Sequence, residues 1–329
     1  MHNNDHNESR QSPGGFPDGE RRVQSDAVRQ AARECGFDAV GIARAEPLEE
    51  AFGRYLEWRR AGMSGPMPWL DDRESRRDVR AILPEARSVV VVAQNYYVPV
   101  QHRPNAAGKI SRYAWGDDYH DVIPEKLDRL RERIREIVPG SVDRRYTDTG
   151  AILEKEWAVR AGLAWQGKHS NVLRRDIGSW FFLGLVITSA DLEPDAPVLD
   201  YCGTCTACMD ACPTHAIVAP YVVDARSCIS TWTIETKPDI EIADHIAANL
   251  DGWLFGCDTC QDVCPWNRFA TDVGDTRFAP RDGVTELAPE AVVDLQPEEF
   301  RTRFRKSPVK RTKLDGLRRN ARALLNKKS

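Results

Sequence analysis

Long hydrophobic runs are missing from this chain. Among its 329 residues the most apolar stretches are residues 88–93 and 180–188, which have the length of a strand, whereas a membrane-spanning helix needs about 18 apolar residues. The polar N-terminus, MHNNDHNESRQSPGGFPDGE, also lacks the apolar core of a secretion signal. We therefore expect a cytoplasmic protein that does not enter a membrane. In that reducing compartment cysteines act as metal ligands rather than as disulfides.

Acidic residues are nearly absent from one segment, residues 301–329. This segment holds 12 of the 46 Lys and Arg residues but a single acid, Asp315. A basic end on an otherwise acidic chain is typical of proteins that bind a polyanion such as nucleic acid. A solvated helix face that improves solubility is the alternative. The chain also lacks internal repeats of about 20–50 residues, so no solenoid array is expected.

Cysteine is concentrated in two runs, which hold eight of the nine cysteines. The first run is Cys202-x2-Cys205-x2-Cys208-x3-Cys212-Pro213, and the second is Cys228 followed by Cys257-x2-Cys260-x3-Cys264-Pro265. The first run has the spacing of bacterial two-cluster ferredoxins, in which three cysteines hold one [4Fe–4S] cluster and the fourth holds the other. The spacing therefore predicts electron transfer.

The same rule predicts which cysteines share a cluster. Three thiolates wrap one cluster along a loop, and the next cysteine reaches only the neighbouring cluster. One cluster is then held by Cys202, Cys205, Cys208 and Cys264, and the other by Cys212, Cys228, Cys257 and Cys260. Zinc is the alternative, because zinc sites favour two separated Cys-x2-Cys pairs, but the crowded first run does not fit it. Cys35 stands alone and is expected to be a buried structural thiol.

The hydrophobic pattern predicts an α/β core over residues 25–198, because strand-like and helix-like segments alternate. Residues 1–24 are expected to form a disordered tail, and Ser25 is expected to cap the first helix. Strands are predicted at residues 37–43, 88–93 and 180–188, and helices at residues 25–35, 48–61, 124–137 and 152–161. The cysteine module occupies residues 199–270. A basic helical segment, residues 271–329, contains a helix start at Pro297 and a helix at residues 313–325.

Four blocks of the core carry a family resemblance. They are GKISRYAWGDDYH from Gly108, DTGAILEK from Asp148, RAGLAWQGKH from Arg160 and GSWFFLG from Gly178. In this order, and followed by the cysteine module, they resemble the epoxyqueuosine reductases, the cobalamin-dependent enzymes of tRNA queuosine synthesis. The resemblance implies an α/β cobalamin-binding core related to the reductive dehalogenases, fused to a ferredoxin-like module with two [4Fe–4S] clusters.

The resemblance also implies a reaction. The epoxide of epoxyqueuosine, at the wobble position of tRNA, is reduced to the cyclopentene of queuosine, and two electrons and two protons remove the oxygen as water. An external low-potential donor of the ferredoxin or flavodoxin type supplies the electrons, which pass through the clusters to cobalamin. A monomer is expected. The residues expected to bind the tRNA backbone are Lys310, Arg311, Lys313, Arg318 and Arg319.

For the cofactor, the resemblance implies a set of contacts with cobalamin. The set is Arg73, Ser111, Tyr113, Asp148, Gln166, Lys168 and His169. Core packing is the alternative for Tyr113, and an ordinary surface position is the alternative for Arg73, Lys168 and His169. The Asp-x-His-x-x-Gly signature of many cobalamin proteins is incomplete here, because Asp118 and His120 are followed by no Gly at the required place. We expect that match to be accidental and the family to bind cobalamin without a histidine ligand.

The resemblance assigns the proton donor to Asp148, which poses a difficulty. The ordinary pKa of an aspartate is about 3.9, which is low for an acid at neutral pH. Asp148 also precedes a predicted helix, whose positive N-terminus would lower the pKa further, so a helix cap is the alternative reading. Catalysis requires burial beneath the flat corrin, which would raise the pKa by desolvation. In addition, Gly150-Ala151 stands where family members often carry Ala or Gly and then Pro.

Two other functions compete with this one. The first is a reductive dehalogenase-like cobalamin reductase that acts on a small molecule, and the basic C-terminal helix argues against it. The second is a ferredoxin-type electron carrier without its own catalysis, and the large α/β core with the Asp148 block argues against that.

Overall fold

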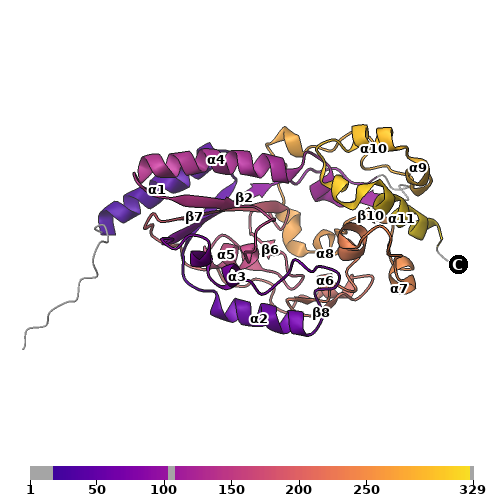
Figure 1. Cartoon of the computed structure of the whole chain (residues 1–329), viewed down its shortest axis with the longest axis horizontal. Helices are drawn as coiled ribbons and strands as arrows, with labels where there is room; N and C mark the ends of the chain where they lie inside the picture. The colour runs from indigo at the N-terminus through magenta and orange to yellow at the C-terminus, as the bar shows by residue number, and fades with distance from the viewer. Residues whose placement is uncertain (1–17, 103–107, 327–329) are drawn as a thin grey trace, which may run out of the picture.

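A four-stranded sheet organises the core of the computed structural model, which describes residues 18–102 and 108–326. The strands, in their order across the sheet, are β1 (Ala39–Arg44), β2 (Ser88–Asn95), β7 (Phe181–Thr188) and β4 (Asp143–Tyr146). Every neighbouring pair is antiparallel. β2 is buried at every position, as expected for the covered central strand predicted at residues 88–93. Helices cover both faces (Figure 1), and the α/β class is confirmed.

Alternate residues of the strands contribute to two separate hydrophobic layers, because successive side chains of a strand point to opposite faces of the sheet. Val90 and Val92 pack with α1 (Asp18–Glu34) and α4 (Tyr119–Ile137). Val89 and Val91 pack with α2 (Glu49–Arg60) and α5 (Glu154–Arg160). The core therefore has three layers, with α1 and α4 above the sheet and α2 and α5 below it in Figure 1.

Helix α1 begins earlier than the sequence predicts. It starts at Asp18, so residues 18–24 of the expected tail are helical, while residues 1–17 lie outside the described chain. Ser25 is not a helix cap. It is fully buried inside α1, where its hydroxyl donates to the Arg21 carbonyl oxygen at 2.7 Å and accepts a hydrogen bond from the Glu193 amide at 2.7 Å. This contact with the segment after β7 stabilises the helix, and local sequence signals do not reveal it.

Helix α4 also begins before its predicted start at Pro124. The carboxylate of Asp118 caps it by accepting a hydrogen bond from the His120 amide at 3.0 Å. Pro124 therefore lies inside the helix, just beyond its first turn, and removes the one backbone hydrogen bond that an amide there would donate to the His120 carbonyl oxygen. The cap matters for function because it fixes His120 in the first turn of the helix.

The cysteine module consists of short elements joined by loops. They are α6 (Ala207–Asp210), β8 (Ile217–Ala219), β9 (Val222–Val223), a π-helical turn (Thr231–Glu235), α7 (Asp244–Ala247), β10 (Trp253–Phe255) and α8 (Thr259–Asp262). β10 pairs in parallel with β3 (Lys109–Ile110) of the core, which joins the module to the core. All nine cysteines lie within the described residues and none forms a disulfide, and Cys35 is buried among the residues under α1 and α4.

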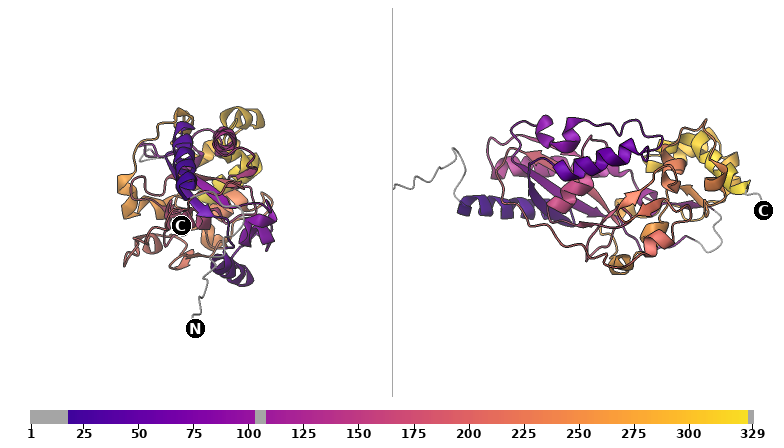
Figure 2. Two further views of the ribbon diagram at one scale, coloured as in Figure 1. Left: turned by 90° about the vertical axis from the view of Figure 1, so that its left-hand side faces the viewer. Right: turned by 90° about the horizontal axis from the view of Figure 1, so that it is seen from below.

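The C-terminal segment packs on the outer side of the cysteine module. It contains α9 (Pro289–Asp294), α10 (Pro297–Arg303) and α11 (Lys313–Leu325), and the last two begin at the residues that the sequence predicts. Leu317 and Ala321 of α11 are buried together with Leu254 and Phe255 of β10. The molecule is elongated, with α1 at one end and α11 at the other (Figures 1 and 2). Within the described residues, no helix is long and apolar enough to span a bilayer.

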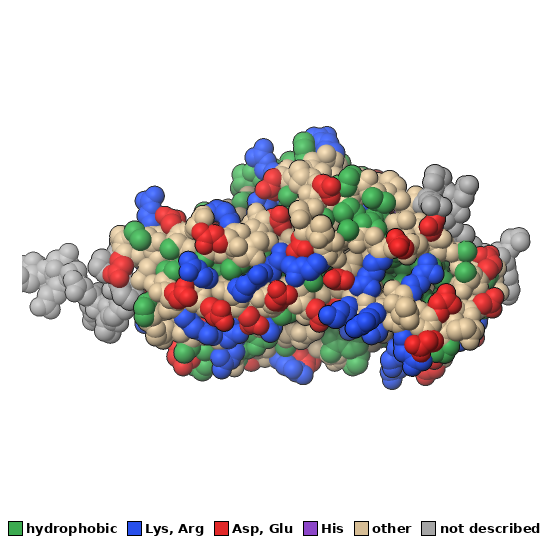
Figure 3. All heavy atoms as spheres, turned by 90° about the horizontal axis from the view of Figure 1, so that it is seen from above, with side chains coloured by type: hydrophobic (Ala, Val, Ile, Leu, Met, Phe, Trp, Pro, Cys, Tyr) green, Lys and Arg blue, Asp and Glu red, His purple; other side chains and the backbone are tan. Residues whose placement is uncertain are grey.

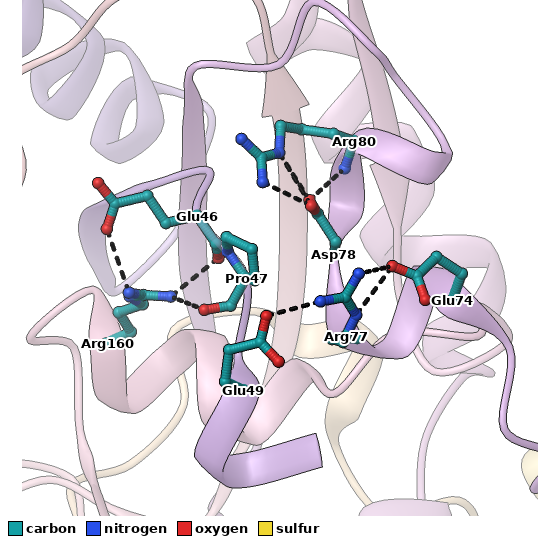
Figure 4. A network of polar contacts seen from close by, with 8 residues as sticks. All are labelled: Glu46, Pro47, Glu49, Glu74, Arg77, Asp78, Arg80 and Arg160. Carbon is teal, nitrogen blue, oxygen red and sulfur yellow. Dashed lines mark hydrogen bonds and ion pairs between the residues drawn. The ribbon is translucent and has the colours of Figure 1, made fainter. Parts of the chain in front are cut away.

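A network of polar contacts joins the start of α2 to α3 (Glu74–Arg77) and to α5 (Figure 4). Arg77 pairs with Glu49 at 2.6 Å and also with Glu74. Arg160 donates to the carbonyl oxygens of Glu46 and Pro47 at 2.9 and 3.0 Å. Exposed ion pairs contribute only about 0–1 kcal/mol each, so this network orients the lower helices more than it stabilises the fold.

Candidate functional site

Four of the cysteines in the two runs line one cavity. The cavity has a volume of about 210 Å³, and its cysteines are Cys202, Cys205, Cys208 and Cys264. Cys264 belongs to the second run, so the two runs cross in space as the spacing rule requires. This is the set predicted to hold the first cluster. The convergence of these four side chains supports their assignment as ligands, which stays a prediction.

The other four cysteines form a second group. Burial raises the pKa of Cys260 well above its ordinary value, and the thiolates of Cys257, Cys228 and Cys212 raise it further. In the same way, the charge of Cys212 raises the pKa of Cys228, and the charge of Cys228 raises the pKa of Cys257. A cubane binds each thiolate to a different iron, so four ligands need not meet at one point. In the described part of the chain, no three His, Cys, Asp or Glu side chains form a site for a single metal ion.

Lys168 and His169, two of the predicted cobalamin contacts, lie beside the first cysteine group. They belong to the loop between β5 (Trp165–Gln166) and β6 (Val172–Leu173). The Lys168 ammonium donates to the carbonyl oxygens of Gly203 and Cys205 at 2.6 and 2.9 Å. It therefore holds the loop that carries the first cysteines.

His169 adds a hydrogen-bond donor to the same cavity. Its Nδ1 accepts a hydrogen bond from the Asn171 amide at 3.1 Å, so the proton of the neutral ring is on Nε2. That nitrogen is buried without a partner in the described chain, and the residue lines the cavity. The sulfurs of an iron–sulfur cluster accept hydrogen bonds of this kind, so the residues present fit a cluster.

Asp148 lies in a hydrogen-bonded chain of three side chains. Nδ1 of His120 is 2.8 Å from Oδ1 of Asp118, and Nε2 of His120 is 3.1 Å from Oδ2 of Asp148. The Tyr119 hydroxyl also interacts with Asp148. Asp148 has a φ of 58°, a left-handed conformation that side chains adopt at a cost and often at functional sites. The Asp118-x-His120 pattern, which we expected to be accidental, therefore places an imidazole on the predicted acid.

Asp148 is not the cap of the helix that follows it. Helix α5 begins at Glu154, its N-cap is Leu153, and no side chain caps it. The Asp148 amide instead donates to Glu154 Oε1 at 2.7 Å. The helix-cap reading of Asp148 is therefore wrong.

The charge balance at Asp148 also differs from our expectation. Burial raises the pKa of Asp148, but the hydrogen bond and positive charge of His120 outweigh burial, and the pKa falls below its ordinary value. Desolvation acts in the expected direction, but His120, which the sequence reasoning did not include, reverses the net effect. Burial lowers the pKa of His120, but Asp118 and Asp148 outweigh it and raise that pKa to about 9. At neutral pH the proton shared by this pair therefore resides on His120.

Glu154 and Lys155 extend the site toward the second cysteine group. Burial raises the pKa of Glu154 to about 8, with the Asp148 charge as the next cause. Burial lowers the pKa of Lys155, and the charges of Cys260 and Asp148 oppose that effect. The charges of both sites therefore reach Lys155, whose ammonium donates to the Ser170 carbonyl oxygen and to Asn171 Oδ1, each at 2.9 Å. The side chain of Asp148 is 57% exposed, although burial is the largest influence on its pKa, so the carboxylate can be reached from solvent.

Of the remaining predicted cobalamin contacts, one lies beside Asp148 and the others lie elsewhere. Tyr113 lies beside Asp148, and its ring centroid is 6.1 Å from that of Tyr119. Ser111 is buried and its hydroxyl donates to Asp258. Arg73 donates to Asp71 Oδ2 at 2.6 Å on the surface, and Gln166 is half-buried on β5. The structure thus brings Tyr113 and Asp148 together, and an exposed carboxylate beside aromatic rings fits a large flat cofactor. As cobalamin contacts, all of these residues stay predictions.

The basic residues predicted to contact tRNA differ in exposure. Lys310, Arg311 and Lys313 are exposed. Arg311 donates to Glu235 at 3.1 Å, and its charge helps to lower the pKa of Asp148. Arg318 is half-buried and donates to the Leu295 carbonyl oxygen at 2.7 Å. On the upper face of the molecule, basic and acidic side chains are interspersed (Figure 3).

Arg319 does not fit the prediction of a tRNA contact. Only 8% of its surface is exposed, and its guanidinium donates to the carbonyl oxygens of Trp232, Lys237 and Ile240 at 2.7, 2.7 and 3.0 Å. Its hydrogen-bonding capacity is therefore spent inside the protein. Arg319 anchors α11 to the π-helical turn that follows Cys228.

Two groups of four thiols and an Asp–His pair together define an iron–sulfur oxidoreductase. A family model described as a 4Fe-4S double cluster binding domain matches residues 201–267, and one described as "Epoxyqueuosine reductase QueG, DUF1730" matches residues 76–149. An epoxyqueuosine reductase of Cellulophaga algicola is 43% identical over 301 residues, which cover 91% of this chain and 97% of that protein. An epoxyqueuosine reductase of Synechocystis is 47% identical over 292 residues, which cover 87% of this chain and 100% of that protein. The chain belongs to the epoxyqueuosine reductase family.

Solved structures agree with this placement. An epoxyqueuosine reductase crystallised with an epoxyqueuosine-modified tRNA-Tyr stem loop has a TM-score of 0.84 and 30% identity, over 92% of this chain and 80% of that one. The Bacillus subtilis enzyme, with its catalytic aspartate loop swung out of the active site, has a TM-score of 0.83 and 29% identity, over 92% and 81%. The resemblance stated from the four sequence blocks is confirmed.

Sequence reasoning missed the role of His120 and the positions of Glu154 and Lys155. The signal for His120 was present, because an Asp two residues before a His at a helix start can cap the helix and bind the ring at once. Nothing in the sequence shows that this ring faces Asp148.

Proposed function

We propose that this protein reduces epoxyqueuosine in tRNA to queuosine. Two electrons and two protons convert the epoxide to an alkene and release its oxygen as water. The observation that carries the proposal is the arrangement of the Asp148–His120 pair, Lys155 and the second cysteine group. In this proposal the pair is the proton source and the second cysteine group is the electron source, and Lys155 is influenced by the charges of both. The names of the relatives, and the modified stem loop bound by a similar structure, supply the substrate.

The electrons travel through the two cysteine groups in this proposal. Each group holds one [4Fe–4S] cluster, and a reduced ferredoxin or flavodoxin supplies the electrons. Cobalamin, when bound, supplies the redox centre that passes them to the epoxide. Tyr113, Asp148 and Gln166 are the residues of the predicted set that we expect to hold it, with Ser111 fixing the backbone behind Tyr113.

The proton comes from His120 through Asp148. Opening an epoxide leaves an oxygen anion, which a positioned acid must protonate. Asp148 alone is a poor acid because its pKa is lowered. His120 holds the proton at neutral pH, so the proton on Nε2 passes to the Asp148 carboxylate, and the carboxylic acid formed in this way protonates the oxygen anion. Asp118 stays ionised and keeps the ring in place.

The tRNA lies against the exposed basic residues of the C-terminal segment. Lys310, Arg311 and Lys313 present their charges to solvent, and Arg311 also lies near Asp148. Backbone contacts of this kind place the anticodon over the site without reading its sequence. We infer that one copy of the chain is sufficient, which sedimentation of the reconstituted protein tests.

The decisive experiment is turnover of the natural substrate. The protein is purified without oxygen, reconstituted with iron, sulfide and cobalamin, and given epoxyqueuosine tRNA with dithionite. Nucleoside analysis should show queuosine, and visible spectra should show both cofactor types. The Asp148→Asn variant should bind tRNA and accept electrons but form almost no queuosine. The proposal is wrong if the wild-type protein leaves the epoxide intact while it dehalogenates an aryl halide.

A further inference from the structure

The first cysteine group lies at the surface, whereas the second does not. Cys205 is exposed, and so are the residues on either side of it, residues 203–206. The four cysteines of the second group are all partly covered. Electron tunnelling weakens steeply with distance, so an external protein can deliver electrons efficiently only to the group that it can approach.

Aromatic and apolar side chains surround this exposed loop. Leu199, Tyr201 and Phe269 have 73%, 37% and 41% of their surface exposed. Tyr201 and Trp266 are in contact, with ring centroids 5.9 Å apart, and Trp266 contacts Phe269 at the same distance. Exposed apolar groups that occur together mark surfaces that bind a partner.

Two arginines without carboxylate partners lie on this surface. Arg175 lies 5.2 Å from the ring centroid of Tyr201, and Arg268 lies 4.5 Å from that of Phe269. Both are exposed, and neither forms a hydrogen bond or ion pair with another described residue. In contrast, the neighbouring Arg174 is paired with Asp176 at 2.7 Å.

Two acids of this region, Asp200 and Asp210, are not paired with these arginines. Asp200 accepts hydrogen bonds from the Tyr221 hydroxyl and from the Cys202 amide, and Asp210 accepts one from Thr206 at 2.7 Å. These donors are neutral, so both carboxylates keep their charge, but neither binds the two guanidinium groups, which are free to meet carboxylates on another protein. We will call Leu199, Tyr201, Phe269, Arg175 and Arg268 the entry surface.

We propose that the entry surface is the docking site of an acidic, low-potential electron-carrier protein. The inference rests on the proposed function, because it takes the first cysteine group as the cluster that receives electrons. In each encounter the carrier's reduced flavin or iron–sulfur centre loses one electron and the first cluster gains it. Two encounters supply the two electrons that one epoxide consumes, and both protons enter separately.

The test compares a protein carrier with a small reductant. The double variant Arg175→Glu/Arg268→Glu reverses the charge of the entry surface. Reduction by photoreduced flavodoxin is followed in stopped flow, without tRNA, by bleaching of the visible iron–sulfur absorbance. We expect the bimolecular rate to fall about tenfold or more at low ionic strength, and the wild-type rate to fall as salt rises. Reduction by dithionite, which needs no docking surface, should be unchanged.

A matched control changes the same charges elsewhere. Arg22 of α1 and Arg129 of α4 are exposed and lie on the other face of the sheet, so Arg22→Glu/Arg129→Glu should leave the flavodoxin rate within about twofold of the wild type. An equal fall in both double variants would mean that net charge alone steers the carrier, and would overturn the proposal. An unchanged rate in the entry-surface variant would overturn it as well.

A second variant and a separate assay complete the test. Should the Glu variant lose its cluster absorbance, Arg175→Gln/Arg268→Gln decides, because it must reduce the salt dependence of the flavodoxin rate while dithionite reduction stays normal. The proposed function is judged separately, since queuosine formation with dithionite uses no carrier. Clusters that accept electrons from flavodoxin in a protein that forms no queuosine would refute the function and keep the entry surface.

Discussion

The two cysteine groups hold the same number of thiols but lie in different surroundings. The first lines a cavity at the surface, where Cys205 is exposed and Lys168 holds the loop. The second lies deeper, where burial and mutual repulsion raise the pKa of Cys260, and its charge and that of Asp148 both act on Lys155. This difference indicates that electrons enter through the first group, at the surface, and pass to the second group, which is nearer to Asp148.

The same comparison separates the two macromolecular partners. The charge of Arg311 is felt at Asp148, so the tRNA is expected on the side of the second group. The carrier is expected at the entry surface beside the first group. Both partners should then bind at once, and saturating tRNA stem loop should not slow reduction by flavodoxin.

The largest effect is expected from removing one ligand of each group in turn. Cys260→Ala should abolish queuosine formation with every reductant, because the recessed cluster is the one next to the site. Cys205→Ala should block reduction by flavodoxin but leave part of the dithionite-driven turnover, since a small reductant can reach the second cluster directly. Electron paramagnetic resonance should show one remaining cluster in each variant. If Cys205→Ala lost activity equally with both reductants, the first group would not be the specific entry point for electrons.

The next largest effect is expected at Asp148. General acid catalysis contributes about 10²–10⁴-fold, and Asp148→Asn keeps the shape of the side chain while removing its ability to transfer a proton. Queuosine formation in a single turnover should fall by that range, while tRNA affinity and cluster reduction stay normal. Near-normal turnover would mean that Asp148 is not the proton donor. The second cysteine group would then differ from the first only in its place on the electron path.

The pH dependence should reveal where the proton is kept. The pKa of His120 is raised from 6.5 to about 9, so the imidazole is protonated below about 9 and the single-turnover rate should fall as the pH rises through that value. Asp118→Asn removes a hydrogen bond that raises this pKa and should move the fall to lower pH. His120→Gln should lose the fall and turn over more slowly at every pH.

Histidine NMR gives a reading of the same pair that does not depend on turnover. In protein labelled at histidine, the His120 resonance should titrate near pH 9, and Asp118→Asn should shift it downward. A merely structural role would leave the resonance of the wild-type protein near the ordinary histidine pKa. In that case Asp148 would have no proton reservoir beside it.

The sequence predicted the parts of this molecule that depend on local pattern. Residues 88–93 are continuously apolar because β2 is buried on both faces, and Pro297 marks a helix start because its missing donor costs nothing there. Cysteine spacing predicted that Cys264 joins the first run, and that cavity has this composition. The strand and the helix start depend on a few neighbouring residues, and the cysteine grouping depends on the four ligands that each cluster needs.

What the sequence could not predict depends on contacts between distant segments. The Ser25 hydroxyl accepts a hydrogen bond from the distant Glu193 amide and does not cap a helix. The pKa of Asp148 follows from a histidine 28 positions earlier, and charge pattern alone cannot tell the exposed Lys310 from the buried Arg319. In each case a partner that is far away in the sequence decides the role of the residue.

The smallest effect separates those two basic residues, and it tests whether the tRNA lies on the side of the second group. Lys310→Ala removes one exposed charge, so tRNA affinity should fall a few-fold and the slope of its logarithm against that of salt should decrease by about 1. Arg319→Leu removes buried hydrogen bonds to the turn after Cys228, so it should lower the melting temperature and loosen the second cluster. Its salt slope should not change, because that guanidinium does not reach a phosphate. A reduced slope in Arg319→Leu protein that keeps its wild-type melting temperature would show that α11 moves to expose this residue, and the tRNA-binding face would then have to be redrawn around it.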